Sequence, residues 1–568
     1  MRARFRPTRL KSVAQRRGFS RRCLATWAPR VATHLYLWLC LGSVLSLTSC
    51  AAIHDAPCSD ALCGSNERCM PDSKGEVRCQ PRCTLSVRCP EIAPICDEEQ
   101  AACRSCRAGD DARCRERSPQ TPRCIAGQCV ACIAKRGFTS ESSDCTSGSR
   151  DGSSPLSSSQ SATPICDQGS CRACQRHSEC DSGVCAKDDS GASFGVFKGQ
   201  CVPFDQVLVV DQNLCSRSGP VYCTPQQAIE RLLPSQRYLL LRKVALASDF
   251  SAIDLSSLPS AGGAVFHLIG PLADAPPQRA DSMPGVTLGG VDGRDGIVVR
   301  SGSVVLEGML VRGNRIGVGC QGNTTSVRIE RSLFVENATA IYAEAGCRLT
   351  LRNSWLGRPP KTSLFAEYAA NARGIEINGA DFRIENSVFA DNGDYSRDAF
   401  GGVRVRSLSA GTARSPIINT TFIQQSGLRR TGKYYTTLWC DSEVRERIVL
   451  FNTLLASDRP LVTSPEEHYL DPSCGAALFN IASNDDGLAK LGVFYSAIDS
   501  IFIDRSKRDL RLLRGTLPEQ QALAQGGALR ISLGDQSFVA PEVDQDGQPR
   551  PGDHVAIGAF EPTTIVPR

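Results

Sequence analysis

The chain of 568 residues carries 65 basic and 59 acidic side chains, a net charge of +6, and 29 cysteines. Ten of the basic residues and none of the acidic ones fall within residues 1–49. Without that segment, 55 basic residues face 59 acidic ones. The composition therefore predicts no basic surface for nucleic acid and no nucleic-acid partner.

Residues 1–49 are predicted to be a lipoprotein signal peptide. The apolar run from Leu35 to Leu47 has the length of a secretion signal and is too short to span a membrane as a helix. It ends in a Leu-Thr-Ser-Cys tetrapeptide that closes at Cys50 and resembles a bacterial lipobox. The resemblance implies cleavage before Cys50 and lipidation of its thiol. The alternatives are a single-span anchor and an accidental match.

The lipobox resemblance also implies where the protein works. Alanine rather than aspartate follows Cys50, and lipoproteins of that kind belong to the outer membrane. We therefore expect a cell-envelope protein that its lipid holds to the outer membrane, with its body exposed at the surface. In such a compartment cysteines form disulfides and persist as such.

Residues 50–202 are predicted to form a cysteine-rich, disulfide-bonded repeat region. Without Cys23, Cys40 and Cys50, 26 cysteines remain, and 20 of them lie between Cys58 and Cys201. Few large apolar residues separate them, so this segment needs cross-links in order to fold. Zinc binding or redox chemistry at the C-x-x-C pairs is the alternative, but after a secretion signal disulfides are favoured and no metal is expected.

The cysteine-rich region contains an internal repeat. Its unit is a small residue, proline, any residue and cysteine, followed by C-x-x-C and one further cysteine. The serine- and glycine-rich residues 139–163 are interpreted as a flexible insertion. The connectivity remains open. The candidate disulfide cysteines are Cys96, Cys103, Cys106, Cys114, Cys124, Cys129, Cys132, Cys145, Cys166, Cys171, Cys174 and Cys180, with Cys215 and Cys223 flanking a later loop.

Residues 203–562 are predicted to form an all-β solenoid, with an N-terminal cap near 215–233 and a tail at 563–568. Apolar-alternating runs recur there, most of them followed by asparagine and a small hydroxyl residue. The spacing of this pattern is about 22 residues and then 33 residues, the latter between Asn353, Asn386, Asn419 and Asn452. Asparagine at one phase of each coil predicts a ladder of side-chain amides at a tight turn.

These repeats resemble the right-handed parallel β-helix family with the pectin-lyase-like fold. Residues 544–551 and 557–561, a D-x-D-G-x-x-R segment before I-G-A-F-E, are similar to the closing motif of bacterial surface β-helix proteins. The resemblance implies a right-handed parallel β-helix whose last coil this motif closes. The whole plan resembles myxobacterial-type surface lipoproteins.

No cofactor is firmly expected. Asp544-Gln545-Asp546-Gly547 has the start of a calcium-loop spacing. The later ligands of such a loop are missing and proline follows. A structural turn is therefore the favoured interpretation, and calcium is the alternative.

The change from a 22-residue to a 33-residue period predicts three inserted loops on one side of the solenoid, within residues 358–443. Aromatic rings stack on sugars, and arginines and carboxylates bind hydroxyl or uronate groups, so these loops are candidates for a glycan groove. The alternative is that they are solvated loops. The candidate ligand-binding residues are Tyr368, Tyr395, Arg397, Tyr434, Tyr435 and Trp439.

Two functions remain open at this stage. The first is non-catalytic binding of glycan or envelope components, or a structural role. The second is a polysaccharide lyase or glycoside hydrolase, for which Asp391, Asp394 and Asp398 are weak candidates as a catalytic carboxylate pair. The motifs that polygalacturonases and pectate lyases use are not found, and the six histidines show no ligand spacing. The non-catalytic function is favoured.

Overall fold

The computed structural model divides the chain into two compact units, Met1–Ser105 and Cys106–Arg568. The predicted signal peptide, Cys50 and the 563–568 tail lie outside the residues that it describes. Within the described part, no helix is both long enough and apolar enough to cross a membrane. The described residues are 63–65, 67–71, 77–81, 89, 94–97, 102–118, 121, 123–132, 139–142, 145, 164–215, 220–242, 253–256, 258, 265–274, 288–289, 293–361, 363, 366–393, 400–411, 413–424, 434–441, 444, 447–457, 467–483, 492–494, 501–504, 507–513, 518–551 and 555–562.

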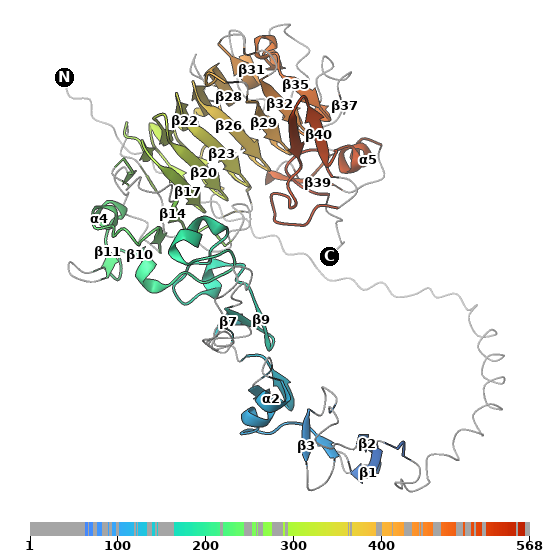
Figure 1. Cartoon of the computed structure of the whole chain (residues 1–568). Helices are drawn as coiled ribbons and strands as arrows, with labels where there is room; N and C mark the ends of the chain where they lie inside the picture. The colour runs from blue at the N-terminus through green and yellow to red at the C-terminus, as the bar shows by residue number, and fades with distance from the viewer. Residues whose placement is uncertain are drawn as a thin grey trace, which may run out of the picture. The chain divides into compact units, whose positions relative to one another are not determined.

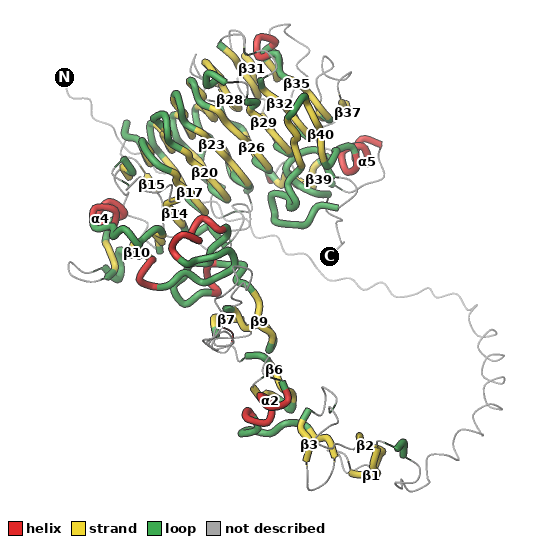
Figure 2. Tube along the Cα trace, in the orientation of Figure 1, coloured by secondary structure: helices red, strands yellow, loops and turns green. Residues whose placement is uncertain are grey.

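The larger unit contains three long sheets in which all neighbouring strands are parallel (Figures 1 and 2). Sheet one consists, in spatial order, of β11 (Val221–Tyr222), β10 (Val207–Val210), β12 (Tyr238–Leu241), β14 (Val265–Ile269), β17 (Ser303–Glu307), β20 (Ser326–Glu330), β23 (Arg348–Arg352), β26 (Asp381–Glu385), β29 (Ser415–Ile418), β32 (Ile448–Phe451) and β35 (Ala477–Phe479).

The other two sheets complete each coil. Sheet two consists of β15 (Leu288–Gly289), β18 (Leu310–Arg312), β21 (Leu333–Val335), β24 (Trp355–Gly357), β27 (Val388–Ala390), β30 (Thr421–Gln424), β33 (Leu454–Ser457), β36 (Ile481–Ser483) and β37 (Gly492–Phe494). Sheet three consists of β13 (Ile253–Asp254), β16 (Ile297–Val299), β19 (Ile316–Cys320), β22 (Thr339–Glu344), β25 (Arg373–Asn378), β28 (Phe400–Ser407), β31 (Tyr434–Cys440) and β34 (Glu467–Leu470).

The chain visits sheets one, two and three in turn and then starts the next coil, so the fold is a right-handed parallel β-helix, as predicted. Apolar residues of successive coils stack in register inside it. One such row contains Val304, Val327, Leu349 and Phe382, all at most 3% exposed. Each coil buries its apolar face against its neighbours, and this stacking supplies the stability that one coil alone would lack.

From β17 onward a tight turn joins sheet one to sheet two, and the predicted asparagines occupy it in four successive coils. Asn353, Asn386, Asn419 and Asn452 have φ between 46° and 51°, in the left-handed region that asparagine tolerates better than other side chains. The amide of Asn452 donates to Oδ1 of Asn419 (3.3 Å), and the amide of Asn480 donates to Oδ1 of Asn452 (3.3 Å). The predicted ladder thus forms over the last coils.

A second asparagine ladder, which the sequence spacing did not indicate, lies at the corner between sheets two and three. The amide of Asn314 donates to Asn337 (3.0 Å), that of Asn337 to Asn371 (2.8 Å), and that of Asn371 to Asn392 (2.9 Å). All four side chains are at most 3% exposed. Because buried amides cost free energy unless they are paired, this column fixes how the inserted loops leave the coils.

The sequence pattern predicted that the extra residues of the longer coils enter on one side of the solenoid. In the structure they enter at two different corners. In the first long coil they lie between sheets two and three, at residues 358–372. In the next two coils they are shared between that corner, at 391–399 and 425–433, and the corner before sheet one, at 408–414 and 441–447. The asparagine phase of the repeat could not distinguish the two corners.

The predicted disulfides are confirmed, and their order follows one rule. In module one (residues 106–129), Cys106 bonds Cys124 and Cys114 bonds Cys129. The first cysteine thus pairs with the third, and the second with the fourth. The remaining described pairs are Cys132–Cys166 and Cys145–Cys171 in module two (132–171), Cys174–Cys185 and Cys180–Cys201 in module three (174–201), and Cys63–Cys79, Cys89–Cys103, Cys215–Cys223, Cys320–Cys347 and Cys440–Cys474.

The two cysteines of a C-x-x-C pair therefore do not bond to each other. Each forms a disulfide on its own side of the boundary between successive modules. Cys103 closes one disulfide with Cys89, whereas Cys106 opens module one. Cys96 is disulfide-bonded as well. The small elements of this region are β1 (Glu67–Pro71), β2 (Val77–Pro81), β3 (Ile95–Asp97), β4 (Ala102–Arg104), α2 (Asp111–Arg117), β5 (Arg123–Ile125), β6 (Gln128–Val130), β7 (Thr139–Glu141), β8 (Ile165–Asp167) and β9 (Ser170–Arg172).

The predicted flexible insertion at 139–163 begins with ordered structure. Its first residues form strand β7, which pairs with β8, and Cys145 is bonded to Cys171. The start of this segment therefore belongs to module two and supplies its third strand and its second cysteine, which the composition did not indicate. Residues 146–163 lie outside the described part.

At the predicted boundary near residue 203 the cysteine content and the strand pattern change. The packing of apolar side chains nevertheless continues across it. Val184, Val196 and Val202 of the cysteine-rich side share an apolar cluster with Tyr238 and Leu240 of the first coil. Beyond them, helix α4 (Pro225–Glu230) covers the entry of the β-helix, with Ala228 and Ile229 buried in the central core.

The C-terminal segment contains β38 (Phe502–Asp504), β39 (Asp509–Leu512), α5 (Pro518–Gln525), β40 (Arg530–Leu533) and β41 (Gln536–Val539). Part of it lies along the outside of the last coils (Figure 1). Phe538 and Val555 pack on Val449 and Phe451 of sheet one. The C-terminal segment therefore covers the outer face of sheet one on the last coils.

Candidate functional site

The outer face of sheet three carries a row of polar and aromatic side chains that cross four coils. Tyr342 of β22 lies opposite Glu376 of β25, Glu376 opposite Arg404 of β28, and Arg404 opposite Trp439 of β31. Their sequence neighbours Ile341, Ile375, Val403 and Leu438 point into the core and are at most 1% exposed. Strands alternate their side chains between two faces, so this row faces outward. With about 4.8 Å between strands, it spans about 14 Å.

Trp439, one of the predicted ligand residues, is held by its neighbour in the row. The guanidinium of Arg404 lies over the Trp439 ring, 4.3 Å from its centroid. The same guanidinium makes a two-pronged ion pair with Asp441, with Nε–Oδ1 and Nη2–Oδ2 distances of 3.1 and 2.9 Å. These contacts fix the orientation of the indole ring, which remains partly exposed.

A groove of about 600 Å³ occupies the same face over β19 to β28. Its volume falls in the range of small-ligand sites. In its wall, Nε of Arg406 lies 2.5 Å from Oε1 of Glu376, whose side chain is only 5% exposed. Among the described residues no carboxylate lies within ion-pair distance of Arg373. The lining side chains include Arg315, Gln321, Tyr342, Glu344, Arg373 and Arg406.

Tyr342 stands at the centre of this groove, and its phenol is kept protonated. Burial, together with the nearby carboxylates of Glu344 and Glu376, raises the pKa of Tyr342, although a hydrogen bond from Asn378 opposes the shift. The Asn378 amide lies 3.4 Å from the phenol oxygen. At neutral pH the phenol is therefore a hydrogen-bond donor and not a base.

Of the other predicted ligand residues, the structure describes Tyr368 and the backbone of Tyr434 and Tyr435. Tyr368 is half-buried, and the guanidinium of Arg312 lies 4.2 Å from its ring centroid. Tyr434 and Tyr435 lie on strand β31, upstream of Trp439. Tyr395 and Arg397 lie outside the described residues. The structure thus places Trp439 on the groove-bearing face and Tyr368 against a different partner.

Asp391, one of the three catalytic candidates, is in a buried structural position. Its carboxylate is 7% exposed and lies 3.6 Å from Nε of Arg508, which is itself largely buried. The residue has φ of 57° and continues the coil beside the ladder residue Asn392. The Asp391 carboxylate is thus engaged in a buried contact with a guanidinium, which does not favour it as an acid–base group of an open groove. Asp394 and Asp398 lie outside the described residues.

The sequence pattern did not single out the row on sheet three. The signal was present as alternation in Ile-Tyr-Ala-Glu at 341–344, Ile-Glu-Ile at 375–377 and Val-Arg-Val-Arg at 403–406. These strands follow the loops and lack the asparagine signature of sheet one. Their register across coils, which brings the four residues into one row, required the structure.

The possible calcium site is a structural turn in this structure. Oδ1 of Asp544 accepts the backbone N–H groups of Asp546 (2.9 Å) and Gln548 (2.7 Å), and Oδ2 accepts that of Glu561 (3.0 Å). Burial raises the pKa of Asp544, and these backbone hydrogen bonds oppose the shift. Both carboxylate oxygens of Asp544 are thus engaged by backbone amides.

Comparisons with known proteins add one likeness. No family model matches the chain, and no curated protein matches it. Among solved structures, the chain is similar to that of pectate lyase Pel9A, with 14% sequence identity, coverage of 63% of this chain and 96% of that chain, and a TM-score of 0.29.

Proposed function

We propose that the protein binds a glycan along the outer face of sheet three and does not cleave it. The observation that carries the proposal is the in-register row of Tyr342, Glu376, Arg404 and Trp439 beside the groove. Aromatic rings supply flat apolar surfaces for sugar rings, and guanidinium and carboxylate groups bind hydroxyls in pairs. A parallel β-helix repeats such groups at a constant spacing, which suits a polymeric ligand.

Binding without cleavage is favoured by the state of the charged groups. Glu376 is ion-paired with Arg406, and Asp441 with Arg404. The pKa of Tyr342 is raised, so the phenol does not act as a base at neutral pH. Most glycoside hydrolases use one carboxylic acid to protonate the leaving group and a second carboxylate as the base or the nucleophile. On this face the paired carboxylates are better suited to hold guanidinium groups in place.

The proposal is tested by titrating the purified protein with neutral and acidic oligosaccharides in a calorimeter. Trp439→Ala should weaken binding by about 10-fold or more, since it removes a preformed stacking surface. Arg406→Ala has a matched control in Arg352→Ala, because Arg352 also pairs with a buried glutamate, Glu385, but on sheet one. Only the first of these two should weaken binding.

The same samples are assayed for new reducing ends and for unsaturated sugar products. Saturable binding that Trp439→Ala weakens, with the polymer left intact, supports the proposal. Chain cleavage by the wild-type protein would instead support the lyase or hydrolase function. Equal affinities in the wild type and in Trp439→Ala would remove the basis of the proposed site.

We also propose that the protein is a lipoprotein of the cell envelope, anchored to the outer membrane through Cys50 and exposed at the surface. The arginine-rich leader, the apolar run that ends at Cys50 and the density of disulfides downstream support this location. A glycan-binding β-helix held at a membrane would attach the cell to a polysaccharide or to other envelope components.

A further inference from the structure

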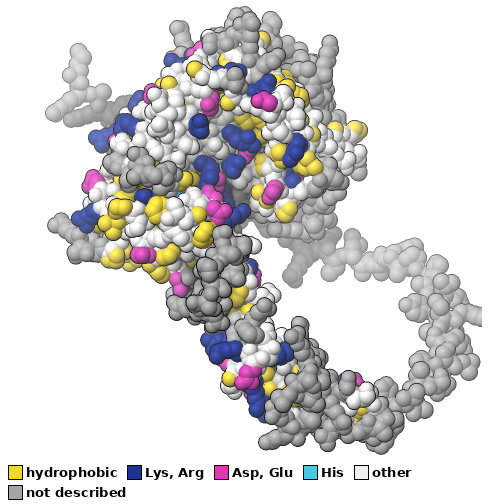
Figure 3. Space-filling model, in the orientation of Figure 1, with side chains coloured by type: hydrophobic (Ala, Val, Ile, Leu, Met, Phe, Trp, Pro, Cys, Tyr) yellow, Lys and Arg dark blue, Asp and Glu magenta, His cyan; other side chains and the backbone are white. Residues whose placement is uncertain are grey.

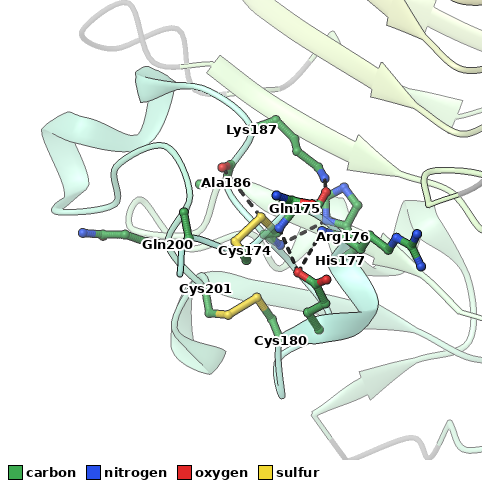
Figure 4. The surroundings of a disulfide bond; sticks show 12 residues. Cys174, Gln175, Arg176, His177, Cys180, Ala186, Lys187, Gln200 and Cys201 are labelled. Atoms are coloured by element: carbon green, nitrogen blue, oxygen red, sulfur yellow. Dashed lines mark hydrogen bonds between the residues drawn. A yellow bond between two sulfur atoms is a disulfide. The ribbon is translucent and has the colours of Figure 1, made fainter. Parts of the chain in front are cut away.

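Module three lies against the outer face of the first coils and is held together independently of them. Its disulfides, Cys174–Cys185 and Cys180–Cys201, lie side by side and both stay within the module (Figure 4). None of these four cysteines therefore forms a disulfide with the β-helix. The module can therefore leave the β-helix surface without unfolding, provided that the contact itself is weakened.

The contact has an apolar part and a polar part. Val184, Val196 and Val202 pack against Tyr238 and Ile269. Around this cluster, charged groups of the module meet charged groups of sheet one, and Figure 3 shows basic and acidic side chains together at this junction. Asp188 of the module is ion-paired with Arg328 of β20. Two buried histidines, one from each side, complete the polar part.

His177 comes from module three and is 4% exposed. Its Nδ1 accepts the backbone N–H of Cys185 (3.1 Å), and its Nε2 lies 3.2 Å from Oε1 of Glu307 on β17. The acceptor role requires an unprotonated Nδ1, so the ring is neutral. A proton on Nδ1 would point at the N–H of Cys185 and break that bond.

Other charged groups around His177 come from both sides of the contact. Asp274, which follows β14, accepts the backbone N–H groups of His177 (2.6 Å) and Ser178 (2.7 Å). Arg331, after β20, is ion-paired with Glu307. Lys187 of the module donates to the backbone oxygen of Gln175 and reaches toward this segment in Figure 4. The carboxylates of Asp274 and Glu307 thus favour an imidazolium here, whereas the cations Lys187 and Arg331 oppose it.

His267 lies on β14 beneath the module and is 6% exposed. Its Nε2 lies 2.7 Å from Oγ of Ser190, and its ring stacks on Tyr238 at 4.7 Å between centroids. Asp188 favours its protonation, whereas Arg328 and His177 oppose it. The backbone oxygen of Arg237, in the adjoining turn, accepts the N–H of His267 (2.7 Å).

Burial makes both histidines resist protonation in the docked state. Burial, aided by Lys187 and Arg331 and opposed by Asp274, lowers the pKa of His177 to about 3. Burial lowers the pKa of His267 to about 4. The pKa of Asp188 is about 2 and that of Asp274 is lowered, so both carboxylates stay ionised in mild acid.

The sign of the pH effect follows from linkage. Exposed histidines have a pKa of about 6.5, so the undocked state binds protons that the docked state excludes. The docked state is therefore fully favoured above about pH 6.5 and loses stability as the pH falls toward 4. At pH 4.5 the undocking equilibrium shifts by about 100-fold for each histidine.

We propose that the contact between module three and sheet one is a pH-sensitive joint, which opens on acidification while the module and the β-helix each remain folded. At neutral pH the joint is rigid, and the site on sheet three is held in a fixed orientation to module three. In an acidified environment the β-helix swings free of the module. The protons that drive the opening go to the two histidines.

Hydroxyl-radical footprinting of the purified chain between pH 7 and pH 4.5, read by mass spectrometry, tests the joint. Tyr238 is the reporter, since it is 2% exposed beneath the module, and Trp355, 1% exposed in another cluster of the β-helix, reports global unfolding. Oxidation of Tyr238 should rise at least 10-fold on acidification while Trp355 stays protected. The proposal is overturned if Tyr238 stays protected, or if both residues become oxidised together.

The variant His177→Asn/His267→Gln separates the histidines from other acid effects. Asn places an oxygen near the position of Nδ1, and Gln places a polar group near that of Nε2, but neither titrates. Tyr238 should stay protected at both pH values in this variant, whereas His468→Gln, on β34, should behave as the wild type. Opening of the double variant in acid would reject the proposal.

If the double variant is already open at pH 7, the two single variants are used to test whether the histidines take up the protons. The slope of the logarithm of the opening constant against pH reports the number of protons taken up and should be about 2 in the wild type below pH 6. His177→Asn and His267→Gln should each reduce it to about 1. A slope that neither variant changes would contradict the assignment to these histidines.

Discussion

At the scale of the residue, asparagine performs two separate tasks in this solenoid. At the turn between sheets one and two it accepts a left-handed backbone, and its amide can reach the next coil. At the corner between sheets two and three it forms a buried column that runs from Asn314 to Asn392. Both tasks use a short side chain with a donor and an acceptor on one planar group.

Asn419→Ala should lower the free energy of unfolding by about 2–4 kcal/mol, because it places an ordinary side chain at φ of 46° and deletes buried hydrogen bonds. Asn419→Gly should cost about 1 kcal/mol less, since glycine tolerates that backbone. Urea denaturation followed by circular dichroism measures both. Equal losses in the two variants would show that the backbone conformation contributes nothing, and Asn323→Ala on an exposed turn serves as the control.

At the scale of the element, residues 526–562 of the C-terminal segment bind along the turns between sheets one and two. We call these residues the clasp. The amide of Asn419 donates to the backbone oxygen of Ala556 (3.0 Å), and that of Asn452 to the oxygen of Ala528 (2.8 Å). Arg550, with a side chain 1% exposed, is ion-paired with Glu561 and donates to Oδ1 of Asn386 (2.9 Å). The closing motif thus satisfies polar groups that the exposed side of the turns would otherwise leave to water.

Arg550→Met should destabilise this clasp by about 3–5 kcal/mol, since it leaves the Glu561 carboxylate without its buried partner. The expected result is faster cleavage by a protease within residues 526–562, at temperatures where the coils remain folded. Arg530→Met, at an exposed position of β40 in the same segment, should leave the cleavage rate unchanged. A clasp as resistant as the wild type in Arg550→Met would argue against the role of the buried ion pair.

At the scale of the whole molecule, cross-linking and stacking stabilise different parts of the chain. Two disulfides hold each of the three modules between Cys106 and Cys201, where apolar residues are few. The β-helix relies on stacked apolar rows, with Cys320–Cys347 and Cys440–Cys474 tying neighbouring coils together. Disulfides of this kind form and persist in oxidising compartments.

Cys50→Ser tests the proposed anchor. In a bacterial host fed a labelled fatty acid, the wild-type chain should carry the label and fractionate with membranes. The Cys50→Ser chain should carry no label and lose at least about 10-fold of its membrane association, because a lipid anchor is the larger part of the binding free energy. Cys23→Ser is the control, since Cys23 lies upstream of the proposed cleavage site. Labelling of the Cys50→Ser chain would exclude Cys50 as the lipidated residue.

Much of the fold was predictable because its signals are local. The period-2 runs gave the strands of sheets one and two, and the repeated asparagines gave the turn between them. The even number of cysteines indicated disulfides. The candidate site was predicted less well: Trp439 lies on the groove-bearing face, whereas Asp391 is buried under Arg508 and Tyr368 is stacked with Arg312. Residues of the inserted loops and residues on the strands of sheet three have similar sequence neighbours. The sequence therefore did not show which of them reach the groove.

The sequence by itself determined the solenoid, the disulfide-rich region and the turn asparagines, because each depends on the spacing of neighbouring residues along the chain. Only the tertiary structure decided the disulfide order, the row from Tyr342 to Trp439 and the buried pair of His177 and His267. Those features depend on register between coils and on contacts between residues far apart in the sequence, such as Asp274 with His177, which are 97 positions apart. Periodicity carries no information about which residue of one coil meets which residue of the next.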